Sequence, residues 1–184
     1  MESGRRRRSP PLTSTTIRIR DYRSQDFNPL WQMDQQCFPP GIAYSRFELM
    51  CFLRAQRSFS LVAEEVARPP GGEPALLGFL VAEQGGSGRR RLGGDDRGHL
   101  VTLDVVAAAR RKGIASRLMD EAEARLVGAG CTVCYLEVAV TNEGAIAFYR
   151  RRAYQTMSRI PGYYGPGLDA LVMARMLPAA PDKH

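Results

Sequence analysis

Histidine is scarce in this sequence, which contains two in 184 residues, His99 and His184. A serine or cysteine hydrolase needs a base beside its nucleophile, and with so little histidine no such base is evident. Acyl transfer through a covalent enzyme intermediate is therefore disfavoured. The same scarcity argues against a zinc site built from cysteine and histidine.

Cysteine is present at four positions, Cys37, Cys51, Cys131 and Cys134. The last two have the CxxC spacing of a metal site or a redox pair. Because they fall in an expected strand, where positions three apart point to opposite faces, they are poorly placed to act together. We therefore expect buried structural thiols and no metal site.

Long apolar runs are also missing, since none reaches the length of a membrane span. The arginine-rich start lacks the apolar core of a secretion signal. A hydrophobic fraction of 44% with 24% charged residues is typical of a soluble globular protein with one core. We expect a cytoplasmic protein, a monomer or a dimer, with no membrane contact.

The first fourteen residues, MESGRRRRSPPLTS, have no apolar periodicity and predict a disordered basic tail. The tail carries Arg5 to Arg8 and Glu2, so four of the seven net positive charges lie in the rest of the chain. A solubilising tail is the simpler interpretation. Contact with RNA is the alternative, although four arginines without aromatic neighbours specify little. A single domain is expected over 15–177, followed by a short tail over 178–184.

Apolar periodicity predicts a mixed order of strands and helices. Expected strands cover 15–22, 58–65, 76–84, 99–106, 132–140, 154–160 and 168–176, and expected helices cover 26–37, 45–54, 113–129 and 142–152. In the third helix, positions 115, 119, 122, 126 and 129 form one apolar stripe. The order suits an α/β or α+β sheet with helices on both faces. No helix pattern follows the glycines of 85–98, so a mobile hairpin tip is expected there instead of a phosphate cradle.

The stretch 103–118, LDVVAAARRKGIASRL, is the most informative part of the sequence. Gly113 falls in the first turn of a predicted helix, where unpaired amides and the helix dipole favour an anion. A glycine there also lets an anion approach the backbone closely. Three cations, Arg110, Arg111 and Lys112, precede it. This pattern predicts a ligand that carries a pyrophosphate.

Glu137 is the only charged residue in 133–140. Burial in an apolar strand disfavours the charged form of a carboxyl group, and the raised pKa that results suits a general base. The alternative is a carboxylate that pairs with an arginine or lies on a solvated face. Asp104 is a similar lone acid in the strand 99–106 and is a candidate for a supporting or substrate-contacting residue.

The loop and a second segment, 136–149 (LEVAVTNEGAIAFY), together resemble the GNAT superfamily of acyl-CoA-dependent N-acyltransferases. The family's pyrophosphate loop has Arg or Gln, two residues, Gly, one residue, and then Gly or Ala. Arg110, Gly113 and Ala115 occupy these places. The proline usual before this loop is Ala107 here.

The second segment is most similar to the RimI-like ribosomal-protein-alanine N-acetyltransferases, in which a strand glutamate lies twelve residues before a helix tyrosine. Glu137 and Tyr149 keep this spacing. The Gly-Phe usual after the tyrosine helix is Ala153-Tyr154 here. The similarity extends over 15–177 and is strongest over 103–154.

The resemblance implies a mixed, mostly antiparallel sheet that is splayed open in the middle. It also implies direct transfer of an acetyl group from acetyl-CoA to a primary amine, with CoA as product. Glu137 takes the amine proton, directly or through water, and Tyr149 protonates the thiolate. Amides near Val105 bind the thioester carbonyl, and Asn142 caps its helix. The implied cofactor contacts are Leu103, Val105, Val106, Arg110, Arg111, Lys112, Gly113, Ile114, Ala115, Asn142 and Tyr149.

The implied acceptor is a protein or peptide N-terminus, with a ribosomal protein among the candidates. Its expected walls are the loop 38–44 and the pair before the last strand, with Phe38, Tyr44, Asp104, Tyr163 and Tyr164 as contacts. An aromatic-capped hairpin is the alternative interpretation of 162–166. A GNAT enzyme acting on a small amine or a lysine side chain, and a non-catalytic acyl-CoA-binding or RNA-associated protein, are the alternative functions. The presence of both Glu137 and Tyr149 speaks against an inactive relative.

Overall fold

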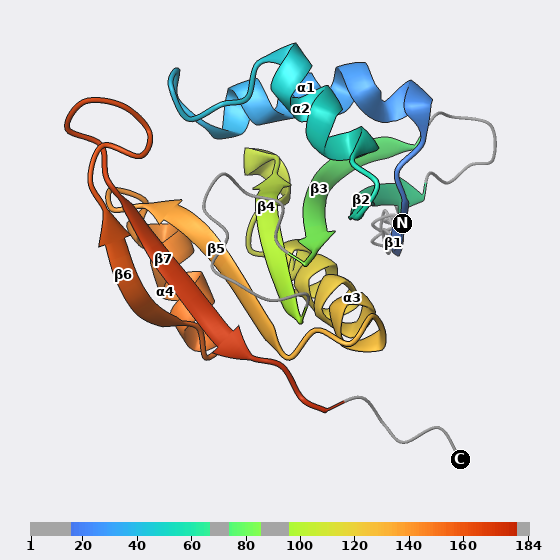
Figure 1. Ribbon diagram of the computed structural model, residues 1–184. Coiled ribbons are helices and arrows are strands. Elements are labelled where there is room, and N and C mark those ends of the chain that lie inside the picture. The colour runs from blue at the N-terminus through green and yellow to red at the C-terminus, as the bar shows by residue number, and fades with distance from the viewer. Residues whose placement is uncertain (1–15, 67–73, 86–95, 180–184) are drawn as a thin grey trace, which may run out of the picture.

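The computed structural model describes residues 16–66, 74–85 and 96–179. Seven strands form one sheet in the order β1-β2-β3-β4-β5-β7-β6. Every neighbouring pair is antiparallel except β4 and β5, which are parallel. The mixed, mostly antiparallel sheet that the resemblance implies is therefore confirmed (Figure 1). The strands are β1 (Thr16–Asp21), β2 (Ser58–Val66), β3 (Ala75–Gln84), β4 (Arg97–Val105), β5 (Val133–Ala139), β6 (Gln155–Ile160) and β7 (Ala170–Met176).

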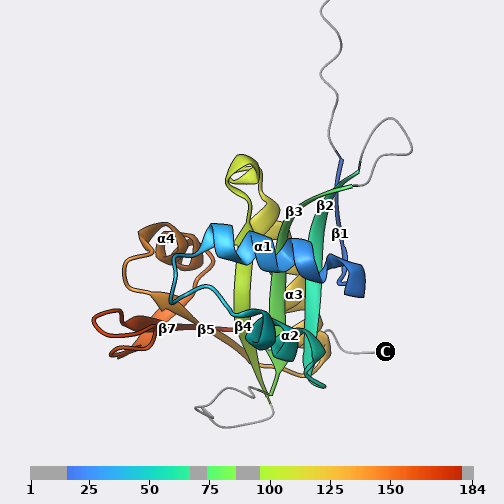
Figure 2. The same cartoon turned by 90° about the horizontal axis from the view of Figure 1, so that it is seen from above.

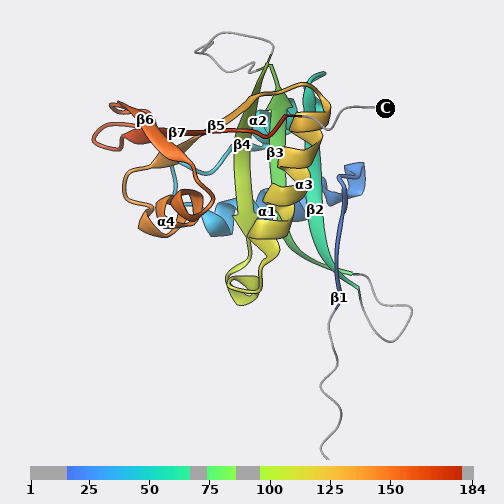
Figure 3. The same cartoon turned by 90° about the horizontal axis from the view of Figure 1, so that it is seen from below.

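Helices cover both faces of the sheet, as predicted. One face carries α1 (Phe27–Cys37) and α2 (Arg46–Arg54), and the other carries α3 (Ile114–Gly128) and α4 (Glu143–Arg151) (Figures 2 and 3). All the predicted helices and strands are present, with ends that differ by at most two residues. Two short 3-10 turns, Ser24–Asp26 and Ala107–Ala109, were not predicted because three residues carry no periodic signal.

Two hydrophobic cores result, one on each face. α1 and α2 pack Leu30 and Leu49 against Phe79 and Val81 of β3. On the other face, α3 and α4 pack against β3, β4, β5 and β7. The predicted stripe on α3 is shifted, because Ala115 and Ala129 are not buried and the buried apolar side chains are Ile114, Leu118, Met119, Ala122 and Leu126.

The parallel pair β4 and β5 separates part-way along its length. The two strands are paired only from Arg97–Val133 to Leu100–Leu136, although both continue beyond that point. Directly after Leu100, the register between β3 and β4 shifts by one residue, which places a β-bulge at Val101. A bulge bends its strand and interrupts the hydrogen-bond ladder. The sheet is consequently splayed between the ends of β4 and β5.

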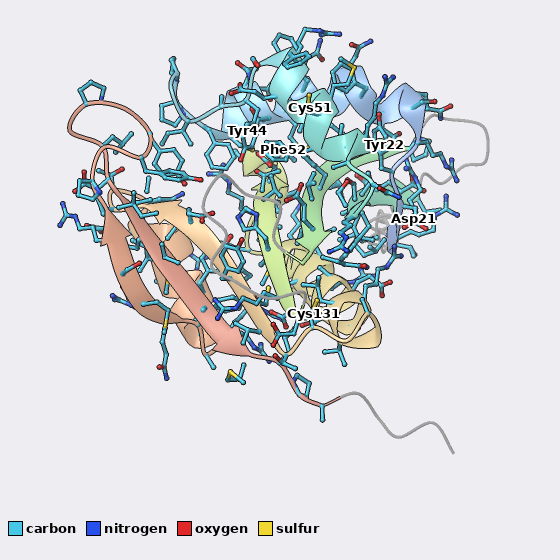
Figure 4. All side chains as sticks on the ribbon, viewed as in Figure 1. Asp21, Tyr22, Tyr44, Cys51, Phe52 and Cys131 are labelled. Atoms are coloured by element: carbon cyan, nitrogen blue, oxygen red, sulfur yellow. The ribbon has the colours of Figure 1, made fainter. Side chains whose placement is uncertain are left out.

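Tyrosine hydroxyls satisfy carbonyl groups that the splay leaves without a strand partner. Tyr44, between α1 and α2, donates to the carbonyl oxygen of Val101 at 3.2 Å. Tyr164, between β6 and β7, donates to the carbonyl oxygen of Glu137 at 3.2 Å. Tyr44 is held in turn against Phe52 of α2, with ring centroids 5.2 Å apart (Figure 4). Because buried backbone groups need partners, these two hydroxyls stabilise the open arrangement.

The cysteines are free, and Cys131 and Cys134 are buried as predicted. Cys131 lies just before β5 and not inside it, so the strand argument applies only to Cys134. In the ranges described, no group of three or more histidine, cysteine or acidic residues could hold a metal ion. Within those same ranges, no helix is both long and apolar enough to cross a membrane. The predicted basic tail, the segment 86–95 of the expected hairpin tip and residues 180–184 lie outside the described residues.

Candidate active site

The loop before α3 has the backbone shape of an anion site. Arg111 and Gly113 both adopt left-handed conformations, with φ of 63° and 78°. Gly113 is the N-cap residue of α3, and no side chain caps this helix start. By contrast, Ser45 and Asn142 cap α2 and α4 through their side chains. The first-turn amides of α3 are thus left to bind an external acceptor, and the dipole there favours a negative one.

The space beside Gly113 is open, since a Cβ atom built there meets nothing within 4 Å among the described residues. Arg110 is tied back to the strand end by its Nε, which donates to the carbonyl oxygen of Val105 at 3.1 Å. The loop forms although Ala107 replaces the usual proline, because a 3-10 turn at Ala107–Ala109 redirects the chain.

A groove extends from this loop between the ends of β4 and α4. Two of the predicted cofactor residues are not among its lining residues. The amide of Val106 donates to the carbonyl oxygen of Leu77 at 3.0 Å, and Lys112 is exposed outside the groove. Ser116 and Arg151, which were not predicted, line it. The predicted residues that line it are Leu103, Val105, Arg110, Arg111, Gly113, Ile114, Ala115, Asn142 and Tyr149.

A second cavity lies in the splay between β4 and β5. Phe38, Ile42 and Tyr44 form its wall on the α1–α2 side, and Glu137 and Tyr164 line the opposite side. The structure therefore brings the two predicted acceptor walls together across the splay. Five residues line both the cavity and the groove, namely Phe38, Leu103, Asn142, Ala145 and Tyr149.

Tyr149 lies where the groove and the cavity meet, on α4. Asn142 caps this helix as predicted, with its side chain accepting from the amide of Ala145 at 3.1 Å. Tyr149 is a buried residue of the core, as the alternative interpretation expected, but none of the described residues hydrogen-bonds its hydroxyl. Burial raises the pKa of Tyr149, and the charge of Asp104 raises it further. The phenol is therefore protonated at neutral pH and able to donate.

Glu137 is not an isolated carboxylate, which corrects the picture drawn from its apolar neighbours in sequence. Its Oε2 lies 2.7 Å from Nε2 of His99 on β4. The alternative interpretation anticipated a pair with an arginine, and the actual partner is one of the two histidines. Sequence reasoning missed His99 because the two residues are 38 positions apart and meet only through the parallel register of β4 and β5.

The tyrosine hydroxyls at the acceptor wall are of two kinds, bonded to the backbone or free. Those of Tyr44 and Tyr164 are bonded to strand carbonyl groups. Tyr163 is 48% exposed and stacks edge-on against Tyr164, with ring centroids 4.8 Å apart. Of the two candidates in this loop, Tyr163 therefore has the hydroxyl that is free to reach a substrate.

Asp104 is separated from the acceptor cavity and buried beneath α1, with 1% of its surface exposed. Its Oδ2 accepts from the hydroxyl of Thr102 at 2.8 Å, and its Oδ1 has no partner among the described residues. Burial, reinforced by the charge of Asp34, raises the pKa of Asp104 to about 8. Burial likewise raises the pKa of Asp34 to about 6. Asp104 borders the groove, but its position favours a structural role over substrate contact.

Comparison with known proteins agrees with this geometry. The Acetyltransferase (GNAT) family model matches residues 25–154, which is 130 of the 184 residues. The chain belongs to the GNAT family. An N-alpha-acetyltransferase of Saccharolobus solfataricus is 38% identical over 82 residues, which cover 44% of this GNAT chain and 49% of that protein. The chain thus spans about half the length of this relative.

Solved GNAT structures share the whole fold. Arabidopsis thaliana NAA60 in complex with acetyl-CoA has a TM-score of 0.75 at 26% identity, covering 88% of this chain and 99% of that one. The ribosomal-protein-S18-alanine N-acetyltransferase from Escherichia coli has a TM-score of 0.71 at 17% identity, covering 92% and 99%. These matches confirm the family and the fold predicted from the sequence.

Proposed function

We propose that this chain transfers the acetyl group of acetyl-CoA to the α-amino group of a protein or peptide N-terminus. The observation that carries the proposal is the shared wall between the groove and the cavity. A donor in the groove and an amine in the cavity meet at Tyr149, with Glu137 on the cavity side. This arrangement supports direct transfer between two bound substrates, without a covalent enzyme intermediate.

The groove residues fit the anionic end of acetyl-CoA. Open amides at Gly113–Ala115 line the groove together with Arg110, Arg111 and Arg151, and these groups would hold a pyrophosphate. When bound, acetyl-CoA supplies a thioester carbonyl that is activated toward an amine. Val105 at the end of β4 lines the groove, and its amide is the proposed donor to that carbonyl oxygen.

Two side chains carry the protons of the reaction. Glu137 accepts a proton from the attacking amine, either directly or through one water. Tyr149 donates its phenolic proton to the departing thiolate of CoA. A C–N bond forms, the C–S bond breaks, and the proton released at Glu137 replaces, through solvent, the one that Tyr149 gives up. The phenol of Tyr149 stays protonated at neutral pH and so has a proton to donate.

The choice of an N-terminal amine rests on the relatives and on the cavity walls. Several relatives are named N-alpha-acetyltransferases, including those of Saccharolobus solfataricus and Sulfurisphaera tokodaii. The aromatic walls at Phe38 and Tyr44 face Tyr164 across the cavity, and the free hydroxyl of Tyr163 is a donor for a peptide backbone. By similarity to the RimI-like branch, the first residue is Ala or Ser, and a ribosomal protein is a candidate acceptor.

The test is acetyl transfer by the full chain to a panel of peptides with different first residues, with thiol release as the readout. Peptides that begin with Ala or Ser should be acetylated faster than free lysine or spermidine. Glu137→Gln should lower kcat about a hundredfold at neutral pH, and Tyr149→Phe should lower it with little change in stability. Equal or faster turnover of the small amines would refute the N-terminal acceptor and favour a small-amine acetyltransferase.

A further inference from the structure

A row of three ionisable side chains crosses the sheet immediately below the splay. Glu83 on β3 and His99 on β4 are register partners. Glu137 on β5 lies two residues beyond Tyr135, the register partner of His99, and so on the same face. His99 is the middle member, and it lies one residue before the last pair that joins β4 to β5.

His99 is held in this position by a hydrogen bond at Nε2 and by ring stacking, and its Nδ1 has no hydrogen-bond partner among the described residues. Its Nε2 is 2.7 Å from Oε2 of Glu137, and its Nδ1 is 3.8 Å from a carboxylate oxygen of Glu83. Its ring stacks on Tyr135 with centroids 4.6 Å apart and planes at 14°. Both His99 and Glu83 are buried, with 7% and 2% of their surfaces exposed.

The charges around the ring favour imidazolium. A neutral imidazole has a single N–H group and no charge, whereas imidazolium has an N–H group on each nitrogen and a positive charge that attracts both carboxylates. Burial by itself lowers the pKa of His99, but Glu137 and Glu83 outweigh it and raise the pKa to about 9. Four tyrosines near these groups have raised pKa values and are neutral near pH 7, namely Tyr44, Tyr135, Tyr163 and Tyr164.

We propose that His99 is a positioning residue that holds the carboxylate of Glu137 in place and oriented toward the acceptor amine. This role rests on the proposed function of Glu137 as the base. His99 holds Oε2, and among the described residues nothing hydrogen-bonds Oε1, which is left to accept the proton of the amine. The imidazolium does not take that proton itself, because both of its nitrogens already carry one. Glu83 acts on His99 and not directly on Glu137, as the counter-charge that keeps the ring protonated.

The first measurement reads the charge of the ring without any activity assay. Since the chain has two histidines, a His184→Ala variant labelled with 15N-histidine shows one imidazole by NMR. We expect both ring nitrogens to be protonated at pH 7.5 and to titrate near pH 9. Glu83→Gln should move the midpoint to lower pH, and Glu137→Gln should move it further. A neutral ring at pH 7.5 would overturn the proposal, even if His99 variants do not fold.

The second measurement is the pH dependence of kcat/KM. His99→Gln keeps an N–H donor beside Glu137 but removes the group that titrates near pH 9, so the decline of the wild-type profile near pH 9 should be lost in the variant. The affinity for acetyl-CoA should stay unchanged. The positioning role is refuted if the wild-type ring is charged and the folded His99→Gln protein still has the pH profile of the wild type. Absence of peptide acetylation by the wild type refutes the proposed function instead, while the NMR titration still decides the state of the ring.

Discussion

Gly113→Val is the sharpest test of the pyrophosphate site, because the chain provides its own control at the other end of α3. Gly113 and Gly130 flank this helix, have φ values of 78° and 85°, and have open space where a Cβ atom would lie. α3 has 15 residues, so the two glycines are about 22 Å or more apart. A valine at either position meets the same backbone strain, but only one of them lies in the groove.

The expected magnitudes follow from this geometry. Placing a residue with a Cβ in the left-handed region costs about 1–2 kcal/mol. In a chain of this size each kcal/mol lowers Tm by about 2–4 °C, so both variants should lose about 2–8 °C. Acetyl-CoA at a hundred times its Kd stabilises a folded protein by about 2.7 kcal/mol, which corresponds to a rise of about 5–10 °C.

The assay is thermal denaturation of the wild type, Gly113→Val and Gly130→Val with and without acetyl-CoA. The wild type and Gly130→Val should show the ligand-induced rise, and Gly113→Val should lose it. Calorimetry should then show Kd for acetyl-CoA raised at least about tenfold, a change of 1.4 kcal/mol. If acetyl-CoA raises the Tm of Gly113→Val as much as that of the wild type, the assignment of the pyrophosphate to this loop is refuted. If both variants lose the ligand-induced rise in Tm, backbone strain is the cause and not the position of Gly113 in the groove.

Two further predictions concern stability. Because the pKa of Asp104 is about 8 in the fold against an ordinary value near 4, the folded state keeps a proton that the unfolded chain releases, and stability falls as pH rises from about 4 to 8. The Tm of Asp104→Asn relative to the wild type should therefore increase as pH rises across this window. A Tm difference between the two proteins that is the same at pH 5 and pH 8.5 contradicts the buried-acid interpretation. Ala153 has φ of 65°, in the left-handed region, so Ala153→Gly should stabilise the fold by about 0.5–1 kcal/mol, measured by urea denaturation. Unchanged or lower stability would show that the left-handed backbone at Ala153 carries no strain.

The elements of the fold were predictable because their signals are local. Apolar spacing located each helix and strand, and Asn142 was recognised as a cap from its place before a helix. The pyrophosphate loop was also predictable, since a glycine at a helix start and the preceding arginines are neighbours in sequence. The shift of the stripe on α3 to Ile114 and Leu118 shows the limit of this reasoning, because the exact face depends on how the helix meets the sheet.

The contacts that complete the site were not predictable in the same way. The pair of His99 and Glu137 depends on the register of two parallel strands, which no local pattern specifies. Glu137 looked isolated because its sequence neighbours are apolar, yet its actual neighbour comes from another strand. Tyr44 and Tyr164 were predicted as substrate contacts and do line the cavity. The sequence did not indicate that their hydroxyls satisfy carbonyl groups exposed by the splay. That need arises only after the strands separate.

The location of the site follows from the one parallel pair in the sheet. Parallel strands require a crossover, and here the crossover contains α3. The start of α3 therefore lies at the end of β4, and β5 runs back toward the same edge, where it brings Glu137. At this edge the bulge at Val101 ends the pairing of the two strands and opens the cavity. A helix start suited to an anion, an open cavity and an oriented carboxylate thus arise from a single β4-α3-β5 unit. Deletion of Val101, which removes the extra residue of the bulge, should therefore narrow the acceptor cavity while leaving the pyrophosphate loop intact.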